Sequence, residues 1–169
     1  MELLESAVNA LKEGREPSLE ELTQQQVEID LRVPALLPED YLGDVNMRLS
    51  FYKRIAGAEN KNALDELKVE LIDRFGPLPE ATKNLLQIAE LRLLAKALKI
   101  IKIDGTLHGG FIEFGPNTDL DPMKFLNLIK QQPAVFKFDG PTKFRFNRSL
   151  EQHKVRLEFV TNLVKNLLD

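Results

Sequence analysis

The chain has 169 residues, of which 43% are hydrophobic and 29% are charged, and its formal net charge is −3. This length supports a buried core without cross-links, and the lack of cysteine excludes disulfides and thiolate metal sites and fits a reducing compartment. A weakly acidic chain has no global attraction for nucleic acid. No apolar run approaches the length of a membrane span, and the acidic residues Glu2 and Glu5 are unlike the basic start of a signal peptide.

The first two dozen residues have a pattern of their own. Apolar residues at helical spacing predict an amphipathic helix over residues 1–13, which ends at Gly14. A polar joint at 14–17 and a short helical turn at 18–21 follow. We therefore expect residues 1–26 to be the peripheral tail of a preceding region, and residues 27–169 to form the main domain.

A strand and two further helices are predicted before residue 100. Alternation of apolar and charged residues predicts a half-buried strand over 27–33. Asp44 is the expected cap of a helix that runs to about Ala56, with an inner face formed by Val45, Leu49, Tyr52 and either Ile55 or Ala56. Pro79 is expected in the first turn of a helix that ends near Lys99 and buries Leu85, Ile88, Leu91, Ala95 and Leu98.

After residue 99 the apolar period changes from helical to alternating. Two strands joined by the glycine-bearing loop 106–110 predict a hairpin, and Asp121 caps a short helix over 122–131. Strands are expected at 135–138 and 143–146. A capping box of Ser149 and Gln152 should then open a last helix, which buries Val155, Phe159, Leu163 and Leu167. The predicted fold is α+β: N-terminal helices packed with a small, mainly antiparallel sheet, expected as a meander, and a C-terminal helix.

The helix predicted over 61–75 has two distinct faces. Leu64, Leu67, Leu71 and Phe75 recur at three- and four-residue spacing and share an apolar face. Gly76 is the expected left-handed C-cap. A second face, which we call the polar arc, carries Glu66, Glu70, Asp73 and Arg74. Such a charge run is most often a solvated surface; the alternative is a preformed docking surface for a protein partner.

Most chemistries find no support in the sequence. No phosphate-binding loop and no nucleophile elbow occurs, and two isolated histidines, His108 and His153, make no convincing zinc site. The carboxylates of the polar arc lack the loop oxygens that calcium prefers. We therefore predict no catalytic residue, no metal site and no cofactor in this chain.

One segment suggests nucleic acid as an alternative partner. Basic and aromatic residues interleave at Lys137-Phe138 and from Lys143 to Arg148, a pattern found where aromatic side chains stack on nucleobases and cations hold phosphates. Strand alternation favours the opposite arrangement, with Phe144 and Phe146 in the core and Lys143 and Arg145 in water.

Three long segments carry a resemblance to a known family. They are Val-Asn-Met-Arg-Leu-Ser-Phe-Tyr-Lys-Arg-Ile-Ala at 45–56, Lys-Val-Glu-Leu-Ile-Asp-Arg-Phe-Gly at 68–76 and Asp-Gly-Pro-Thr at 139–142. In these segments the chain resembles the C-terminal domain of bacterial transcription-repair coupling factors, the Mfd family. One departure is Gly43, where the family pattern has proline.

The resemblance implies a regulatory, non-enzymatic domain of a bacterial cytoplasmic protein. Members of the family have a UvrB-like N-terminal module, a segment that binds RNA polymerase and an ATP- and magnesium-dependent DNA translocase, all absent from this chain. In the family, the C-terminal domain packs on the UvrB-like module and masks the surface that binds the excision-repair protein UvrA. The family contact surface includes the helix that carries Glu70, Asp73 and Arg74, which favours docking as the role of the polar arc.

Overall fold

The computed structural model describes residues 27–116, 118 and 120–169, so the predicted N-terminal helix, joint and turn lie outside the described residues. The described chain divides into two compact units, one of residues 34–93 and one of residues 27–33 and 94–169. No helix in this described part is long and apolar enough to cross a membrane.

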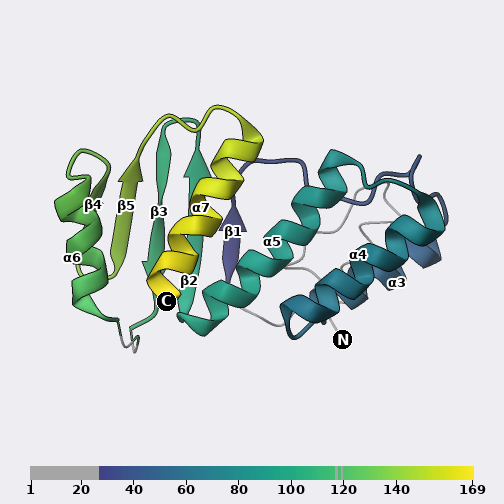
Figure 1. Ribbon diagram of the computed structural model, residues 1–169, viewed down its shortest axis with the longest axis horizontal. Coiled ribbons are helices and arrows are strands. Elements are labelled where there is room, and N and C mark those ends of the chain that lie inside the picture. Colours follow the sequence, from purple (N-terminus) through teal and green to yellow (C-terminus); the bar gives the residue numbers. More distant parts are fainter. Residues whose placement is uncertain (1–26, 117, 119) are drawn as a thin grey trace. The chain divides into compact units, whose positions relative to one another are not determined.

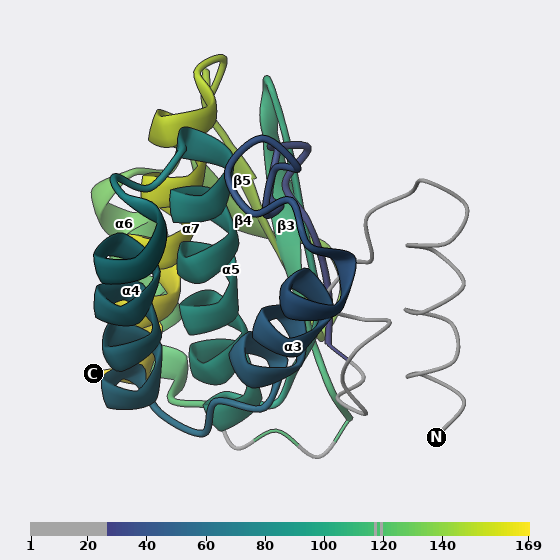
Figure 2. The same cartoon turned by 90° about the vertical axis from the view of Figure 1, so that its right-hand side faces the viewer.

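The first unit is helical. It contains α3 (Val45–Ala56), α4 (Lys61–Phe75) and most of α5 (Glu80–Ala97), whose last residues belong to the second unit. Figure 2 shows the three helices beside one another. Their shared core is apolar and consists mainly of Leu37, Leu42, Phe51, Tyr52, Ile55, Leu64, Leu67, Leu71, Leu78, Leu85, Leu86 and Ala89.

The second unit is a five-stranded sheet with two helices. Its strands are β1 (Glu28–Asp30), β2 (Ile100–Thr106), β3 (Gly109–Phe114), β4 (Phe136–Phe138) and β5 (Lys143–Asn147). Their order is β1-β2-β3-β5-β4; β1 lies parallel to β2 and every other pair is antiparallel. The helices are α6 (Pro122–Gln131) and α7 (His153–Leu168), and Figure 1 shows α7 crossing in front of the sheet.

This architecture confirms the predicted α+β class, but the sheet is not a meander. Strand β3 pairs with β5, and β4 lies at the edge, because α6 separates β3 from β4 along the chain. The hairpin of β2 and β3 has the predicted position. Residues 27–33 alternate as predicted, with Val27 and Leu31 buried, yet only Glu28–Asp30 form a strand, because Arg32 has a φ of 53° that interrupts the extended backbone.

The buried faces of two helices differ from the prediction because an arginine occupies part of each. In α3 the buried residues are Arg48, Phe51, Tyr52 and Ile55, whereas Val45 is 46% exposed. The Arg48 guanidinium donates a hydrogen bond of 3.0 Å to the Leu42 carbonyl, which supplies the partner that a buried cation needs.

In α7, Leu163 and Leu167 are buried as predicted, but Val155 is exposed and Arg156 is buried. Arg156 donates to the carbonyl oxygens of Leu31 at 2.8 Å and Leu150 at 3.0 Å. The predicted capping box is wrong: the N-cap is Gln152 and it makes no side-chain capping bond.

The helix α5 agrees better with its pattern. Leu85, Leu91 and Ala95 are buried, and Ile88 and Leu98 are half-buried. It begins one residue after Pro79 and ends at Ala97, two residues before Lys99, whose φ of 57° ends the helical backbone.

Candidate protein-docking site

The helix α4 is fixed at both ends and along its apolar face. The side chain of Asn60 accepts a hydrogen bond of 2.9 Å from the Ala63 amide and caps the N-terminus. Gly76 has a φ of 93°, which glycine adopts at little cost, and its ψ of −168° differs from the left-handed helical cap that the sequence predicts. The hydroxyl of Tyr41 donates to the carbonyl of Gly76 at 2.9 Å. Leu64, Leu67 and Leu71 are buried and Phe75 is half-buried, so the predicted apolar face is confirmed.

Glu70 is held by two arginines. Arg54 of α3 donates to both carboxylate oxygens, with Nη2 to Oε1 at 2.7 Å and Nη1 to Oε2 at 2.9 Å. Arg74, one turn further along α4, donates to Oε2 at 3.2 Å. The contact between α3 and α4 is therefore bidentate, the geometry that gives a carboxylate–guanidinium pair its orientation.

Both arginines also lie over aromatic rings. The Arg54 guanidinium lies 5.0 Å from the centre of the Phe51 ring, and that of Arg74 lies 5.6 Å from Phe51 and 5.2 Å from Phe75. Phe51 and Phe75 pack edge to face at 5.9 Å. Cation–π contacts of this kind restrict the arginines further, so these side chains form a preorganised surface. We call Arg54, Glu70, Arg74, Phe51 and Phe75 the paired cluster.

The arginines lower the pKa of Glu70 from its ordinary value of 4.5 to about 2. The hydrogen bonds from Arg54 are the largest cause, followed among the favourable interactions by the hydrogen bond from Arg74. The same contact raises the pKa of Arg54. Glu70 thus stays charged at every pH at which proteins ordinarily work.

The other members of the polar arc differ from Glu70. Glu66 and Asp73 are exposed, and neither forms an ion pair within the described part of the chain. A hollow of about 440 Å³ beside Glu66 is also lined by Arg54, Asn60 and Leu67. The structure therefore divides the predicted arc into one fixed carboxylate and two that are available to a partner.

Sequence reasoning missed three residues of this surface. Arg54 was present in the family motif, but no local spacing rule links it to Glu70, sixteen residues away. Val69 and Ile72 are 57% and 41% exposed, although both are aliphatic. Val69 follows Glu66 by three residues and precedes Asp73 by four, so all three share one face of α4. An aliphatic residue between two carboxylates on the outer face of the helix was the signal that could have marked this face as a binding surface.

The remaining candidates from the sequence give no site of their kind. Within residues 27–116, 118 and 120–169, no group of three or more histidine or acidic residues could hold a metal ion. His108 and His153 are exposed. Phe144 and Phe146 are 0% and 2% exposed, so base stacking on these two rings, the sequence-based alternative, is wrong: the alternation of β5 turns them into the core and leaves Lys143 and Arg145 on the other face.

Comparisons with known proteins agree with this fold. The family model described as the TRCF domain matches residues 31–125. The transcription-repair-coupling factor of Haemophilus influenzae is 67% identical over 167 residues, which cover 99% of this chain and 15% of that protein. For the transcription-repair-coupling factor of Escherichia coli the identity is 52%, with coverage of 99% of this chain and 14% of that protein. The chain thus spans about a seventh of the length of these relatives.

A solved structure gives the same result for the fold. The crystal structure of the C-terminal domain of a transcription-repair coupling factor superposes with a TM-score of 0.72 at 24% identity, covering 85% of this chain and 92% of that one. The resemblance noted in the sequence is confirmed, and the chain belongs to the TRCF domain family, as a domain of a bacterial transcription-repair coupling factor.

Proposed function

We propose that this chain is an autoinhibitory protein-interaction domain. In the parent protein it docks through α4 on the UvrB-like N-terminal module and masks the surface that binds UvrA until RNA polymerase is engaged. The observation that carries the proposal is the outer face of α4, where the exposed Glu66, Val69 and Asp73 stand beside the fixed carboxylate of Glu70.

The geometry of α4 suits a docking surface because its parts have little freedom to lose. Glu70 is bonded to two arginines, and the helix rests on buried leucines. Docking therefore orders few additional side chains, which reduces the entropic cost of binding. A complementary partner surface has an apolar centre that contacts Val69 and Ile72, and cations that pair with Glu66 and Asp73.

A mixed polar and aliphatic face also fits a contact that must open. Large apolar interfaces belong to obligate complexes, whereas charged pairs define register and partner choice with modest net affinity. When both surfaces belong to one polypeptide, the tether supplies a high effective concentration, and a weak contact keeps the site covered. Because this domain and UvrA compete for the same surface of the UvrB-like module, release of the domain and binding of UvrA are coupled.

The proposal includes the absence of catalysis in this chain. We expect it to bind neither ATP nor magnesium, since its sequence has no phosphate-binding loop. The motor, its contacts with DNA and RNA polymerase, and the cytoplasmic setting belong to the proposed parent. Saturable binding of ATP to the isolated chain in calorimetry would contradict this part.

The test of docking uses the full-length parent protein with the triple change Glu70→Ala, Asp73→Ala and Arg74→Ala. We expect UvrA binding to rise in the absence of RNA polymerase, because a hydrogen-bonded charge lost at an interface leaves its partner unpaired. Val69→Asp should have the same effect by placing a charge against the apolar centre of the partner. The matched control is Glu80→Ala with Lys83→Ala, which removes an exposed ion pair of 3.2 Å from the neighbouring helix α5 and should leave UvrA binding at its resting level.

A second measurement tests docking without UvrA. The isolated UvrB-like module should retain the native chain in a pull-down and lose the triple variant. UvrA binding that stays at the resting level in both the triple variant and Val69→Asp would contradict masking by α4. Equal retention of native and triple-variant chains would contradict docking through the polar arc.

A further inference from the structure

The two faces of the sheet in the second unit differ in chemistry. Both α6 and α7 pack on one face: Phe125 of α6 contacts Phe144 at 5.0 Å, and Phe159 of α7 contacts Phe146 at 5.3 Å between ring centres. Because side chains alternate along a strand, the neighbours of these residues in the sequence project from the opposite face. That face, which we call the open face, carries Phe111 of β3 together with Lys143 and Arg145 of β5.

Phe111 lies at the centre of a group of cations. Its backbone is paired with that of Arg145 on one side and of Asp104 on the other. The Lys143 ammonium lies 4.5 Å from the ring centre, the Arg145 guanidinium 5.8 Å and the Lys102 ammonium 5.9 Å. We call Phe111, Lys102, Lys143 and Arg145 the open cluster. The ring of Phe111 is half-buried, and the cations that lie over it come from flexible side chains.

The carboxylates around the open cluster are mostly paired. Asp104 is bonded to Arg32 at 3.0 Å, and Asp139 to Arg145 at 2.6 Å. Lys102 lies 3.9 Å from Glu28. Within the described residues, no ion pair involves Lys143, Lys137 of β4 or Glu113 of β3.

The half of the open face formed by β3, β5 and β4 therefore carries a small positive excess. Three cations, Lys137, Lys143 and Arg145, stand there against two carboxylates, Asp139 and Glu113. This excess can attract a polyanion, but only weakly and in a salt-dependent manner.

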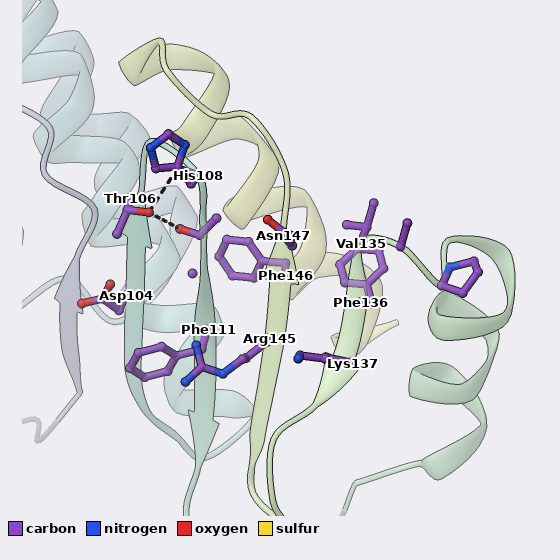
Figure 3. A pocket seen from close by; sticks show the side chains of 14 residues that line it. Asp104, Thr106, His108, Phe111, Val135, Phe136, Lys137, Arg145, Phe146 and Asn147 are labelled. Atoms are coloured by element: carbon purple, nitrogen blue, oxygen red, sulfur yellow. Dashed lines mark hydrogen bonds between the residues drawn. The ribbon is translucent and has the colours of Figure 1, made fainter.

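A hollow of about 520 Å³ lies along the same strands (Figure 3). Phe111 and Arg145 lie side by side in it, and Lys137 projects from the next strand. His108 and Asn147 lie at its other end and supply hydrogen-bonding groups. The hollow thus combines an aromatic surface, the two cations Lys137 and Arg145, the carboxylate of Asp104 and neutral polar groups in one place.

We propose that the open face binds single-stranded nucleic acid, with one base stacked on Phe111 and the adjoining phosphates held by Lys143, Arg145 and Lys137. This site is separate from the α4 surface and does not depend on the proposed autoinhibition. Bases of every kind offer a π-face to an aromatic ring, so the site has little preference for sequence. Lys143 leaves the ring when a base stacks and then reaches a phosphate, since a lysine stem is flexible.

The aromatic ring favours nucleic acid over an acidic peptide as the occupant. Cations alone would serve a run of carboxylates equally well, and the ring would add nothing to that contact. A duplex is also a poor occupant, because its bases are already stacked on one another and cannot reach Phe111.

The experiment measures fluorescence anisotropy of labelled oligonucleotides of about 12 nucleotides with the full 169-residue chain. One arm uses single-stranded DNA, a second RNA and a third duplex DNA, in salt from about 50 to about 200 mM. We expect the single strands to bind and the duplex to bind more weakly. Contacts with two or three phosphates predict a slope of log affinity against log salt of about −1.4 to −2.1.

Substitutions then separate stacking from charge. Phe111→Leu keeps an apolar side chain and removes the ring, and it should weaken single-strand binding by about 5- to 100-fold. Phe111→Trp should retain or strengthen binding. Lys143→Ala should weaken binding and make the salt slope shallower, whereas the control Lys130→Ala on α6, which removes an exposed lysine from another surface, should change neither.

Three results would each overturn the proposal. The first is no binding of any single strand at the lowest salt. The second is equal binding of native, Phe111→Leu and Phe111→Trp chains while all three keep the native melting temperature. The third is a duplex that binds as tightly as a single strand, or a polyglutamate peptide that displaces the oligonucleotide equally from native and Phe111→Leu chains, since either would reduce the surface to a simple cationic patch.

Discussion

The paired cluster and the open cluster both place cations against a phenylalanine ring, and only in the paired cluster does one carboxylate join the cations to each other. In both, a cation lies over a phenylalanine ring: the Arg54 guanidinium is 5.0 Å from the centre of the Phe51 ring, and the Lys143 ammonium is 4.5 Å from the centre of the Phe111 ring. In the paired cluster Glu70 joins both arginines, whereas the cations of the open cluster share no such anion.

This difference indicates what each surface can bind. A carboxylate that fixes two guanidinium groups occupies part of their donors and leaves an ordered surface, which suits a protein partner of complementary shape. In the open cluster Arg145 is paired with Asp139, and Lys102 lies near Glu28. Lys143, in contrast, is held only by the ring of Phe111 among the residues that the structure describes, and it retains its donors for an anion from outside. Substitutions in the support beneath each cluster, and then on the surface of α4 itself, test this comparison.

The largest effect is expected beneath the open cluster. Phe144 is fully buried and packs against three other phenylalanines, among them Phe136, whose ring stacks on it at 5.5 Å. Phe144→Ala should destabilise the fold by about 3–5 kcal/mol, the usual cost of removing a buried aromatic side chain. Denaturant unfolding followed by circular dichroism measures it. The neighbouring Arg145→Ala, on the other face of β5, is the control and should have a much smaller effect on stability.

Leu71 has the corresponding place beneath the paired cluster. It is fully buried among other core residues, with 0% relative exposure to water. It directly follows Glu70 in α4. Leu71→Ala should cost about 2–5 kcal/mol of stability. Val69→Ala on the outer face of the same helix should cost far less, because Val69 is already 57% exposed. Equal losses for the two variants would mean that the outer face of α4 is structural.

The helix α4 could be predicted from the sequence because its signals are local. Leucine spacing defines the buried face, and Asn60 and Gly76 mark the ends. The pairing of Glu70 with Arg54 could not be predicted, since the two residues are sixteen positions apart and meet only when α3 packs on α4. Sequence spacing favoured the weaker partner, Arg74, at 3.2 Å.

The errors elsewhere have a common physical cause. Arg48 and Arg156 are buried because their donors meet backbone carbonyls, and a pattern of apolar residues contains no information about such acceptors. Each arginine takes a buried position that the apolar pattern did not assign, while Val45 and Val155, which were predicted to be buried, are exposed. The open cluster was missed for a similar reason: Phe111 meets Lys143 and Arg145 only through the pairing of β3 with β5.

A smaller effect on stability is expected when three charged residues are removed from the surface of α4. Glu70→Ala, Asp73→Ala and Arg74→Ala together should leave the melting temperature of the isolated chain nearly unchanged. The ion pairs lie at the surface, where solvent and salt screen most of their attraction. Thermal melts at low and high salt check this, with Glu80→Ala and Lys83→Ala as the matched surface pair. A triple variant that melts as early as Leu71→Ala would show that these residues serve the fold rather than a partner.

The smallest effect concerns the protonation of Glu70 and distinguishes its two arginines. Its folded pKa of about 2 lies below the ordinary 4.5, so the pairing stabilises the fold above pH 4.5 and this contribution is lost as the pH falls through about 2. A titration of the Glu70 side-chain carboxyl by NMR should therefore have its midpoint near pH 2. Arg54→Ala should raise the midpoint more than Arg74→Ala, because Arg54 makes two hydrogen bonds, at 2.7 and 2.9 Å, against one at 3.2 Å. An equal or opposite order would mean that the contact within α4, and not the one between α3 and α4, orients the carboxylate.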